Sequence, residues 1–331
     1  MLKTGLKVVV TDYEFPSVSI EREILKEIGA NLIEGHCKTE DDVIAIASDA
    51  DVVINQYTPI TEGIIKHFKK CKAIIHYGIG VNNVDIKAAT KREIYVVTIP
   101  DYCVDDVSTH AMTLILTCLR KVVFLNNALK QDGKWDFNLA KPIRRLSSLT
   151  LGIVGFGKIG RSLAKKAKGF EFCRILAYDP YVSINAKEEY NEVRMVDITE
   201  LLKEADIISI HVPLNEKTRH FFNEEKFQMM KKNAIIVNVS RGSVIDEKAL
   251  IKALEHAQLG GAGLDVFEEE PVTNNNPLLK MKNVVITPHL AWYSEEALQD
   301  LQKKVAEEAV RILQGGRPIS SVNAELIKGG N

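Results

Sequence analysis

Three polar residues in the second half of the sequence, Arg241, Glu270 and His289, have the side-chain types needed for acid–base chemistry on an acidic substrate. Each follows an apolar run typical of a buried strand, and these runs are residues 235–239, 264–267 and 284–287. Loops at the carboxyl ends of strands line the ligand crevice of an open α/β sheet, so the three side chains are expected to meet there. Histidine donates protons near neutral pH, a carboxylate stabilises the imidazolium, and arginine binds carboxylates bidentately. The set favours hydride transfer to the carbonyl of a 2-oxo acid, whose oxygen needs a proton.

Each of these residues also has a plainer interpretation when it is taken alone. Arg241 is compatible with a capping or surface salt-bridge role, Glu270 with a solvated loop acid, and His289 with a satisfied loop histidine. Their joint placement at three strand ends favours the functional interpretation. The other seven histidines show no metal-ligand spacing, and they are predicted to be structural or on the surface, with the first-domain His76 kept as a possible cleft residue. They are His36, His67, His76, His110, His211, His220 and His256.

A glycine-rich turn lies between two apolar runs at residues 149–154 and 175–178. Gly155 allows a tight turn, Gly157 lets the backbone approach a pyrophosphate, and Gly160 lets the following helix pack closely on the strand. That helix begins near Lys158 and directs its amides and positive dipole end at the phosphates. The strand, turn, helix and strand in this order predict a dinucleotide-binding fold.

Asp179 ends the second run of this unit, where a carboxylate accepts hydrogen bonds from the adenosine ribose hydroxyls. A carboxylate repels a 2′-phosphate, and residues 180–186 contain no Arg or Lys to attract one. The sequence therefore favours NAD over NADP.

A second glycine turn follows the apolar run at residues 73–76, with Gly78 and Gly80 in the sequence HYGIG. Exposed amides of such a turn hold a carboxylate, although an ordinary strand–helix turn has the same glycines. The turn contains no Arg or Lys, which argues for an unphosphorylated acid. Aromatic residues are candidates for a wall around an apolar substrate tail, or else for core or interface packing. They are Tyr77, Trp292 and Tyr293.

Short apolar runs alternate with helical patterns along the 331 residues, a length that fits two doubly wound α/β domains with parallel sheets. The first domain has predicted strands at residues 7–10, 52–55, 73–76 and 94–97. The second has six, at residues 151–154, 175–178, 207–211, 234–239, 262–266 and 284–287. A long connecting helix is predicted over residues 104–130, and a final helix over 294–313.

Composition excludes several partner classes. The 43 basic and 44 acidic residues give no electrostatic reason to expect nucleic acid or a membrane surface. No apolar run approaches the ~20 residues that cross a bilayer, and the first residues lack a secretory pattern. The five cysteines show no C-x-x-C spacing, so a reduced cytoplasmic compartment without a disulfide framework or metal site is expected.

These motifs together resemble the D-isomer-specific 2-hydroxyacid dehydrogenases, over nearly the whole chain. The matching stretches are YGIGVNNVD, GIVGFGKIG with Asp179, ADIISIHVPLNEKTRHFF, NVSRGSVIDEKAL, GLDVFEEEP and ITPHLAWYS. The resemblance implies an NAD(H)-dependent enzyme with Arg241 on the substrate, His289 as general acid/base and Glu270 as its partner. It also implies that a Rossmann domain at residues 102–289 is inserted into a flavodoxin-like substrate domain at 1–101 and 290–331.

The resemblance also extends the expected binding sites. The cofactor site is expected to use Asp265 for the nicotinamide carboxamide, and Pro213 and Thr218 nearby. The full expected cofactor set is Gly155, Gly157, Lys158, Ile159, Gly160, Asp179, His211, Val212, Pro213, Thr218, Val239, Ser240, Arg241, Asp265 and His289. The expected substrate set is Tyr77, Gly78, Ile79, Gly80, Arg241, His289 and Trp292. Family members are usually homodimers through the cofactor domain.

Two alternative functions accompany this interpretation. The sequence HLAWYS after the histidine looks like the branch of C-terminal-binding-protein corepressors, which would make the protein an NAD(H)-sensing dimer that binds peptides. A D-3-phosphoglycerate dehydrogenase using Arg144 or Arg145 is the other alternative, although HYGIG lacks the arginine common in those enzymes.

Overall fold

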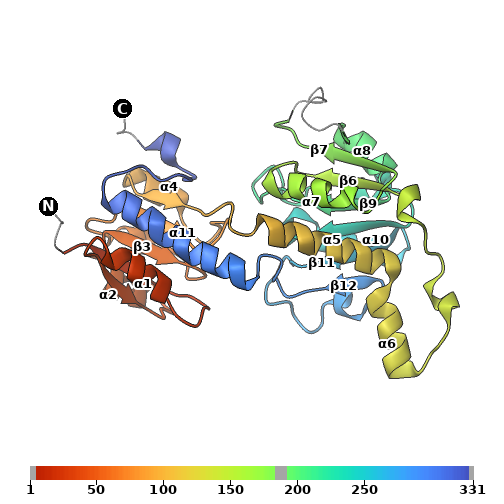
Figure 1. The fold of residues 1–331 in the computed structure, drawn as a ribbon, viewed down its shortest axis with the longest axis horizontal. Helices are drawn as coiled ribbons and strands as arrows, with labels where there is room; N and C mark the ends of the chain where they lie inside the picture. Colours follow the sequence, from red (N-terminus) through yellow and green to blue (C-terminus); the bar gives the residue numbers. More distant parts are fainter. Residues whose placement is uncertain (1–4, 183–191, 328–331) are drawn as a thin grey trace. The chain divides into compact units, whose positions relative to one another are not determined.

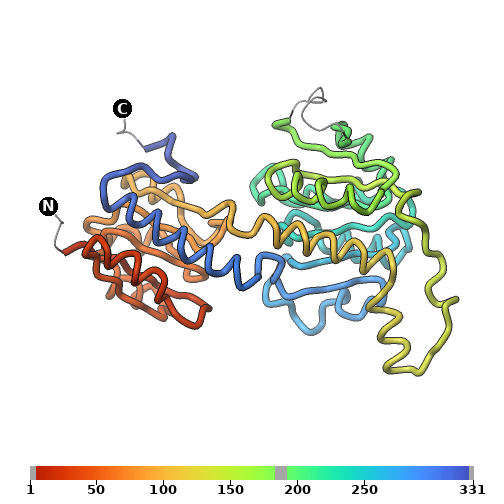
Figure 2. Tube along the Cα trace, in the orientation of Figure 1, coloured from red at the N-terminus to blue at the C-terminus, as the bar shows by residue number. Residues whose placement is uncertain are grey.

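The computed structural model describes residues 5–182 and 192–327, and the chain divides into two compact units. Unit 1 is assembled from two segments, Met1–Cys103 and Ser294–Asn331, and unit 2 is the continuous segment Val104–Tyr293. The sequence places these boundaries after residues 101 and 289. Each unit is built around one all-parallel sheet, and Figures 1 and 2 show the two sets of elements.

The sheet of unit 1 has five strands in the order β2-β1-β3-β4-β5 among the described residues. These are β1 (Lys7–Val10), β2 (Asn31–Glu34), β3 (Val52–Asn55), β4 (Ala73–His76) and β5 (Tyr95–Val97). The central β3 and β4 are Val- and Ile-rich and buried at every residue, as parallel strands covered on both faces must be. The order is that of flavodoxin-like folds.

Helices cover both faces of this sheet. Val43, Ile64 and Ala88 bring three short helices onto one face. They are α2 (Glu40–Ala47), α3 (Glu62–Ile65) and α4 (Ile86–Lys91). On the other face α1 (Ser19–Lys26) and α11 (Glu295–Leu313) lie side by side (Figure 1), and α11 packs on β3 and β4.

The sheet of unit 2 has seven parallel strands in the order β12-β11-β10-β9-β6-β7-β8. These are β6 (Thr150–Val154), β7 (Arg174–Tyr178), β8 (Val193–Met195), β9 (Ile207–Ile210), β10 (Ala234–Asn238), β11 (Leu259–Leu264) and β12 (Val284–Ile286). The strand order reverses between β6 and β9, and a crevice for ligands forms at the carboxyl ends of strands at such a point. The doubly wound Rossmann architecture expected from the sequence is therefore confirmed.

One face of this sheet is covered by α5 (Val104–Arg120) and α7 (Lys158–Lys168), which pack on each other. The other face holds an apolar core built around Leu201, Phe227 and Leu250. Its helices are α8 (Ile198–Glu204), α9 (Glu224–Met229) and α10 (Glu247–Glu255). Unit 2 also contains the 3₁₀ turns η1 (Phe137–Ala140), η2 (Leu146–Ser148), η3 (Gly242–Val244) and η4 (Pro277–Lys280), while η5 (Ala324–Leu326) belongs to unit 1.

The predicted helix over residues 104–130 is wrong in one respect, because it is two helices. Lys121 has a left-handed backbone with φ of 53°, and α6 (Val122–Asp132) follows it at an angle of 58° to α5. Among the described residues no single helix is long and apolar enough to cross a membrane; only this bent pair meets the length and composition criteria together.

Two strands, β2 and β8, were absent from the prediction. Both are edge strands of three or four residues, and each has a single buried residue, Leu32 in β2 and Met195 in β8. Other elements cover little of the surface of an edge strand, so few of its residues need to be apolar. Its hydrophobic periodicity is then too weak to distinguish it from a loop.

Candidate active site

The glycine turn after β6 has the geometry that a dinucleotide requires. A Cβ on Gly155 would lie 2.7 Å from the carbonyl of His211, and one on Gly160 would lie 2.2 Å from the Gly155 oxygen. Gly155 also has φ of +94°, a conformation that side chains rarely adopt. A Cβ on Gly157 would meet nothing within 4 Å, and no side chain caps α7 at this residue. The turn therefore leaves space and helix-end amides for a pyrophosphate.

Asp179 is fixed against this turn by two backbone hydrogen bonds. Its Oδ2 accepts from the amide of Phe156 over 2.8 Å, and its Oδ1 accepts from the amide of Tyr181 over 2.9 Å. Each oxygen keeps acceptor capacity for a ribose hydroxyl. Part of the segment 180–186, which was expected to disfavour a 2′-phosphate, lies outside the described residues.

The residues after β9 form a second wall of the predicted cofactor site. Burial lowers the pKa of His211 to about 3, so its imidazole is neutral, and Nε2 pairs with the Ser209 hydroxyl at 2.8 Å. Its Nδ1 is shielded from solvent and has no hydrogen-bond partner among the described residues. Further along, the Thr218 hydroxyl donates to the Pro213 carbonyl over 2.5 Å and closes the loop. Lys158 is exposed, and Ile159 and Val212 are half-buried.

Glu270 and His289 form a hydrogen-bonded pair in unit 2. Nδ1 of His289 lies 2.6 Å from Oε2 of Glu270, and the Phe267 amide donates to Oε1 over 2.9 Å. Burial alone raises the pKa of Glu270. The hydrogen bonds from His289 and Phe267, with the charges of His289 and Arg241, outweigh burial and hold that pKa below its ordinary value. Glu270 is therefore bonded and ionised, unlike a solvated loop acid.

Arg241 is carried by a loop that touches the Glu270 loop directly. A Cβ on Gly242 would lie 1.8 Å from the carbonyl carbon of Phe267, so only glycine permits this approach. On the other side, the Asn238 side chain donates to the Arg241 carbonyl over 2.9 Å and accepts from the Ser240 amide over 3.0 Å. The fold thus brings Arg241, whose charge acts on Glu270, into the same corner as the His289 pair.

Asp265 organises the loop that carries His289. Its carboxylate accepts hydrogen bonds from the amides of Leu290 (3.0 Å) and Ala291 (2.9 Å), and its carbonyl accepts from the His289 amide (2.8 Å). These contacts hold His289 in a left-handed backbone conformation with φ of 52°. Trp292 closes the loop by donating from Nε1 to the His289 carbonyl over 3.1 Å.

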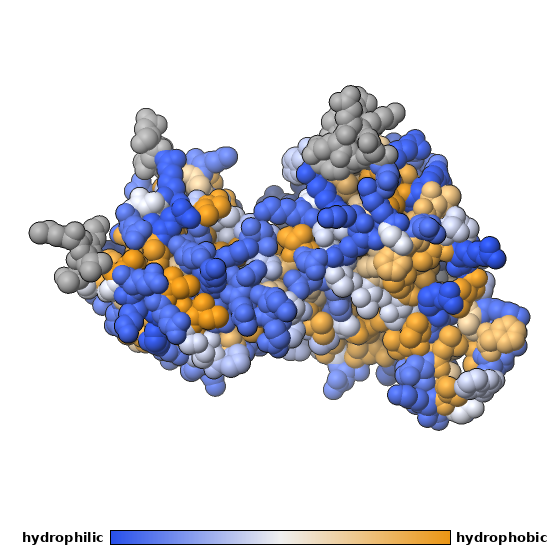
Figure 3. All heavy atoms as spheres, viewed as in Figure 1, coloured by the Kyte–Doolittle hydropathy of each residue, from blue (hydrophilic) through white to orange (hydrophobic). Residues whose placement is uncertain are grey.

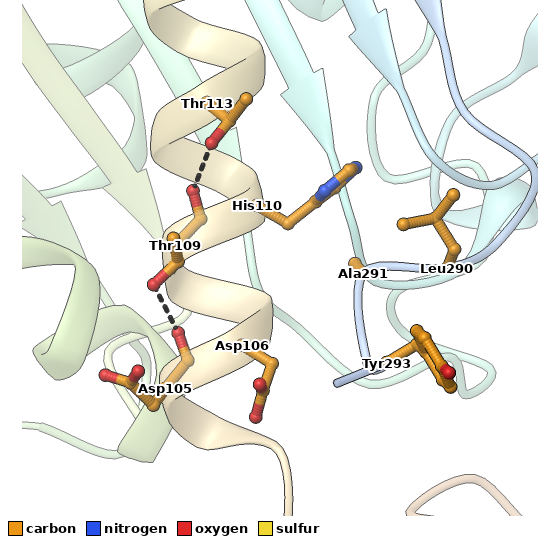
Figure 4. Close-up of a pocket in the computed structure, with 8 residues that line it drawn as sticks. All are labelled: Asp105, Asp106, Thr109, His110, Thr113, Leu290, Ala291 and Tyr293. Carbon is orange, nitrogen blue, oxygen red and sulfur yellow. Dashed lines mark hydrogen bonds between the residues drawn. The ribbon is translucent and has the colours of Figure 1, made fainter. Parts of the chain in front are cut away.

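His110, expected to be structural or exposed, belongs to this network. Its ring projects from α5 toward the segment that contains Leu290 and Ala291 (Figure 4). Nε2 of His110 lies 2.9 Å from the Thr287 hydroxyl, which in turn donates to Asp265 over 2.6 Å. Beside it is a cavity of about 250 Å³ lined by Asp105, Asp106, Thr109, His110, Thr113, Leu290, Ala291 and Tyr293. No local sequence signal connects His110 to residues more than 150 positions away.

The glycine turn of unit 1 differs in detail from the expectation. The amide of Gly78 donates to the His76 carbonyl over 2.9 Å, so it is not free for a ligand. The amides of Ile79 and Gly80 have no hydrogen-bond acceptor among the described residues, and Ile79 is exposed. The anion-binding capacity of the turn lies at these two residues.

The Tyr77 side chain is not the aromatic wall that the sequence suggested. It is 3% exposed, and its hydroxyl donates to Oε1 of Glu21 over 2.7 Å, inside unit 1.

Arg144, proposed as a phosphate ligand in one alternative, instead pairs with Asp206 at 2.8 Å and donates to the Ser148 carbonyl. Among the described residues no group of three or more His, Cys, Asp or Glu side chains is placed to hold a metal.

The two parallel sheets, the glycine turn and the histidine–carboxylate pair define a dinucleotide-dependent oxidoreductase. Residues 112–291 match the family model for the NAD-binding domain of D-isomer specific 2-hydroxyacid dehydrogenases. The chain belongs to this family and uses NAD(H), as the glycine turn and Asp179 predict.

Named relatives support the assignment over the full length. A glyoxylate reductase of Korarchaeum cryptofilum is 38% identical, over 95% of this chain and 97% of its own. A D-3-phosphoglycerate dehydrogenase of Methanocaldococcus jannaschii is 40% identical, over 96% of this chain but 59% of its own. The crystal structure of D-lactate dehydrogenase from Aquifex aeolicus with NAD and lactic acid is similar, with a TM-score of 0.82 and 27% identity, covering 98% of both chains.

Proposed function

We propose that this protein reduces a small, unphosphorylated 2-oxo acid to the D-2-hydroxy acid, with NADH as the hydride donor. The observation that carries the proposal is the 2.6 Å hydrogen bond between His289 and Glu270, beside the charge of Arg241. The similarity to a glyoxylate reductase supports the reaction type and favours a short substrate.

The residues divide the reaction between them. The glycine turn and Asp179 would hold NADH, which when bound would supply the hydride. Because Nδ1 of His289 is bonded to Glu270, Nε2 is the nitrogen available to give a proton to the carbonyl oxygen. The ionised Glu270 stabilises the imidazolium before transfer. Arg241 binds the substrate carboxylate and polarises the ketone. Within the described part of unit 1, the amides of Ile79 and Gly80 are free to bind a carboxylate.

The experiment is a measurement of NADH consumption with a panel of 2-oxo acids. The panel contains glyoxylate, pyruvate, hydroxypyruvate, a branched and an aromatic 2-oxo acid, and 3-phosphohydroxypyruvate. We expect turnover of a short unphosphorylated acid, and a decrease of at least roughly 10²-fold in kcat for His289→Ala. Tight NADH binding without turnover of any panel member would contradict the proposal and favour the peptide-binding sensor.

A phosphorylated substrate is the second candidate, because the Methanocaldococcus relative is named a D-3-phosphoglycerate dehydrogenase. The pairing of Arg144 with Asp206 and the lack of Arg or Lys in residues 77–80 argue against it. Preference for 3-phosphohydroxypyruvate over hydroxypyruvate in the same panel would decide for the phosphorylated acid.

A homodimer through unit 2 is part of the proposal. Helix α6 and the segment after it project from the body of unit 2 (Figure 1), where Figure 3 shows hydrophobic surface. The exposed apolar side chains there are Val122, Val123, Leu129, Trp135, Phe137 and Ile143. So large an exposed apolar set is typical of an interaction site. Light scattering after size exclusion should give twice the monomer mass, and Trp135→Asp with Phe137→Asp should give the monomer.

A further inference from the structure

A carboxyl group is buried in unit 1 without a cation beside it. Glu21 on α1 is 0% exposed, and none of the ion pairs among the described residues includes it. Burial raises the pKa of Glu21, while hydrogen bonds from Tyr77 and Gln302 lower it in part. A buried carboxyl group is costly unless its hydrogen bonds are satisfied, so its partners matter.

Glu21 joins two helices to the residue that precedes the glycine turn. The Tyr77 hydroxyl donates to Oε1 over 2.7 Å, and Nε2 of Gln302 on α11 donates to Oε2 over 3.0 Å. Gln302 also donates to the Ser17 carbonyl over 2.8 Å. The Tyr77 ring meets Phe15 edge-on at 4.8 Å, which fixes the ring as well as its hydroxyl.

Tyr77 also fixes the start of the glycine turn in which the amides of Ile79 and Gly80 are free. Its own amide donates to the Asn55 carbonyl over 2.9 Å, and the next residue, Gly78, has φ of +149°. The Gly78 carbonyl accepts from the Ile99 amide over 2.9 Å. Within the described part of the chain no hydrogen bond anchors the backbone of Ile79, and glycine adds backbone freedom. The direction of the Ile79 and Gly80 amides therefore depends on the anchors at Tyr77 and Gly78, and the Tyr77 side chain is one of these anchors.

We propose that Glu21, through the Tyr77 hydroxyl, is a positioning residue for substrate binding, because it fixes the turn whose Ile79 and Gly80 amides receive the substrate carboxylate. This inference rests on the proposed function for the identity of the ligand. Neither Glu21 nor Tyr77 touches the substrate. Loss of their hydrogen bond weakens binding of a 2-oxo acid and leaves the cofactor site of unit 2 unchanged.

The test uses Tyr77→Phe, which removes the hydroxyl and keeps the ring. Tyr13→Phe is the matched control, because the Tyr13 hydroxyl also donates to a glutamate, Glu34, over 2.8 Å in the same unit. Loss of one buried hydrogen bond corresponds to about a tenfold change in an equilibrium constant. We expect KM for the 2-oxo acid to rise about tenfold in Tyr77→Phe, with kcat and KM for NADH within about twofold of wild type. Tyr13→Phe should match wild type throughout.

A second measurement does not depend on turnover. The dissociation constant of oxamate, an unreactive 2-oxo acid analogue, is measured on the NADH-bound protein by calorimetry, and it should rise about tenfold in Tyr77→Phe. The loss in the double variant Tyr77→Phe/Glu21→Gln should be smaller than the sum of the losses in the two single variants, because each single change already weakens the Tyr77–Glu21 hydrogen bond.

The outcomes separate the two proposals. Unchanged KM and oxamate affinity in a folded Tyr77→Phe protein, while wild type is active, would overturn the positioning role alone. Equal losses in KM for NADH and for the 2-oxo acid would also overturn it, since a purely structural defect acts on both. A wild-type protein that neither turns over the panel nor binds oxamate would overturn the proposed function, and this inference with it.

Discussion

Nδ1 of His289 and Oε2 of Glu270 lie 2.6 Å apart, although the two residues belong to different loops of unit 2. The contact uses one ring nitrogen and leaves the other for the substrate. Glu270→Gln keeps a hydrogen-bond acceptor but removes the charge that stabilises the imidazolium. We expect kcat to fall roughly 10- to 100-fold, at or below the low end of general acid–base contributions, because the histidine itself is kept. Steady-state kinetics measure the effect. The control is the neighbouring variant Glu269→Gln, whose kcat should resemble that of wild type.

The same pair predicts a dependence of stability on pH. The pKa of Glu270 is lowered by folding from its ordinary value of 4.5. A carboxyl with a lowered folded pKa contributes stability above the unfolded pKa, and it loses that contribution as pH falls through the folded pKa. Glu270→Gln should therefore melt at a lower temperature than wild type at pH 7, and the difference should shrink below about pH 4.5. Thermal melts between pH 7 and 3.5 test this, and a constant difference would contradict it.

Residues that do not take part in the chemistry are also expected to affect kcat, and Thr287 is one of them. It donates to Asp265 over 2.6 Å, and Asp265 holds the backbone around His289. Thr287→Val keeps the shape and removes a hydrogen bond to a charged group, so kcat should fall about tenfold. The control is Thr113→Val on α5, because the Thr113 hydroxyl donates to the Thr109 carbonyl of the same helix over 2.9 Å (Figure 4). Equal kcat in Thr287→Val and Thr113→Val would argue against the network.

Asp179 is expected to make the protein prefer NADH to NADPH. Its carboxylate is fixed by the amides of Phe156 and Tyr181 beside the glycine turn. Asp179→Asn retains one acceptor oxygen and removes the charge that repels a 2′-phosphate. We expect the ratio of kcat/KM for NADH to that for NADPH to fall at least about tenfold, as for one lost charged hydrogen bond. An unchanged ratio would show that Asp179 does not select the cofactor.

Gly242 lies where two loops meet, and a larger side chain at this position should lower the stability of the protein. A Cβ there would lie 1.8 Å from the Phe267 carbonyl carbon, so Gly242→Ala must push apart the loops of Arg241 and Glu270. Overpacking of this kind costs about 1–3 kcal/mol, and we expect a lower melting temperature together with a loss of kcat/KM. Gly169→Ala is the control, because its nearest neighbour, the Lys166 carbonyl oxygen, is 3.6 Å away. Normal melting and kinetics in Gly242→Ala would refute the argument.

Much of the fold of both units could be predicted because the sequence signals are local. The glycines at 155, 157 and 160 and the acid at 179 act through backbone conformation and short spacing, and their geometry agrees with the expectation. Central strands such as β3 and β6 are continuous apolar runs because both faces are covered, so the sequence shows them. The edge strands β2 and β8 lack that coverage. The break at Lys121 lies within an apolar pattern that continues on both sides of it.

The sequence by itself determined the family, the parallel sheets and the residue types at the strand ends, because periodicity and glycine conformation are properties of neighbouring residues. Only the tertiary structure decided which distant groups meet. His110 joins Thr287 across 177 positions, and Tyr77 turns inward to Glu21 across 56. Such contacts depend on how helices pack on the sheets, because that packing brings together residues that are far apart in the sequence.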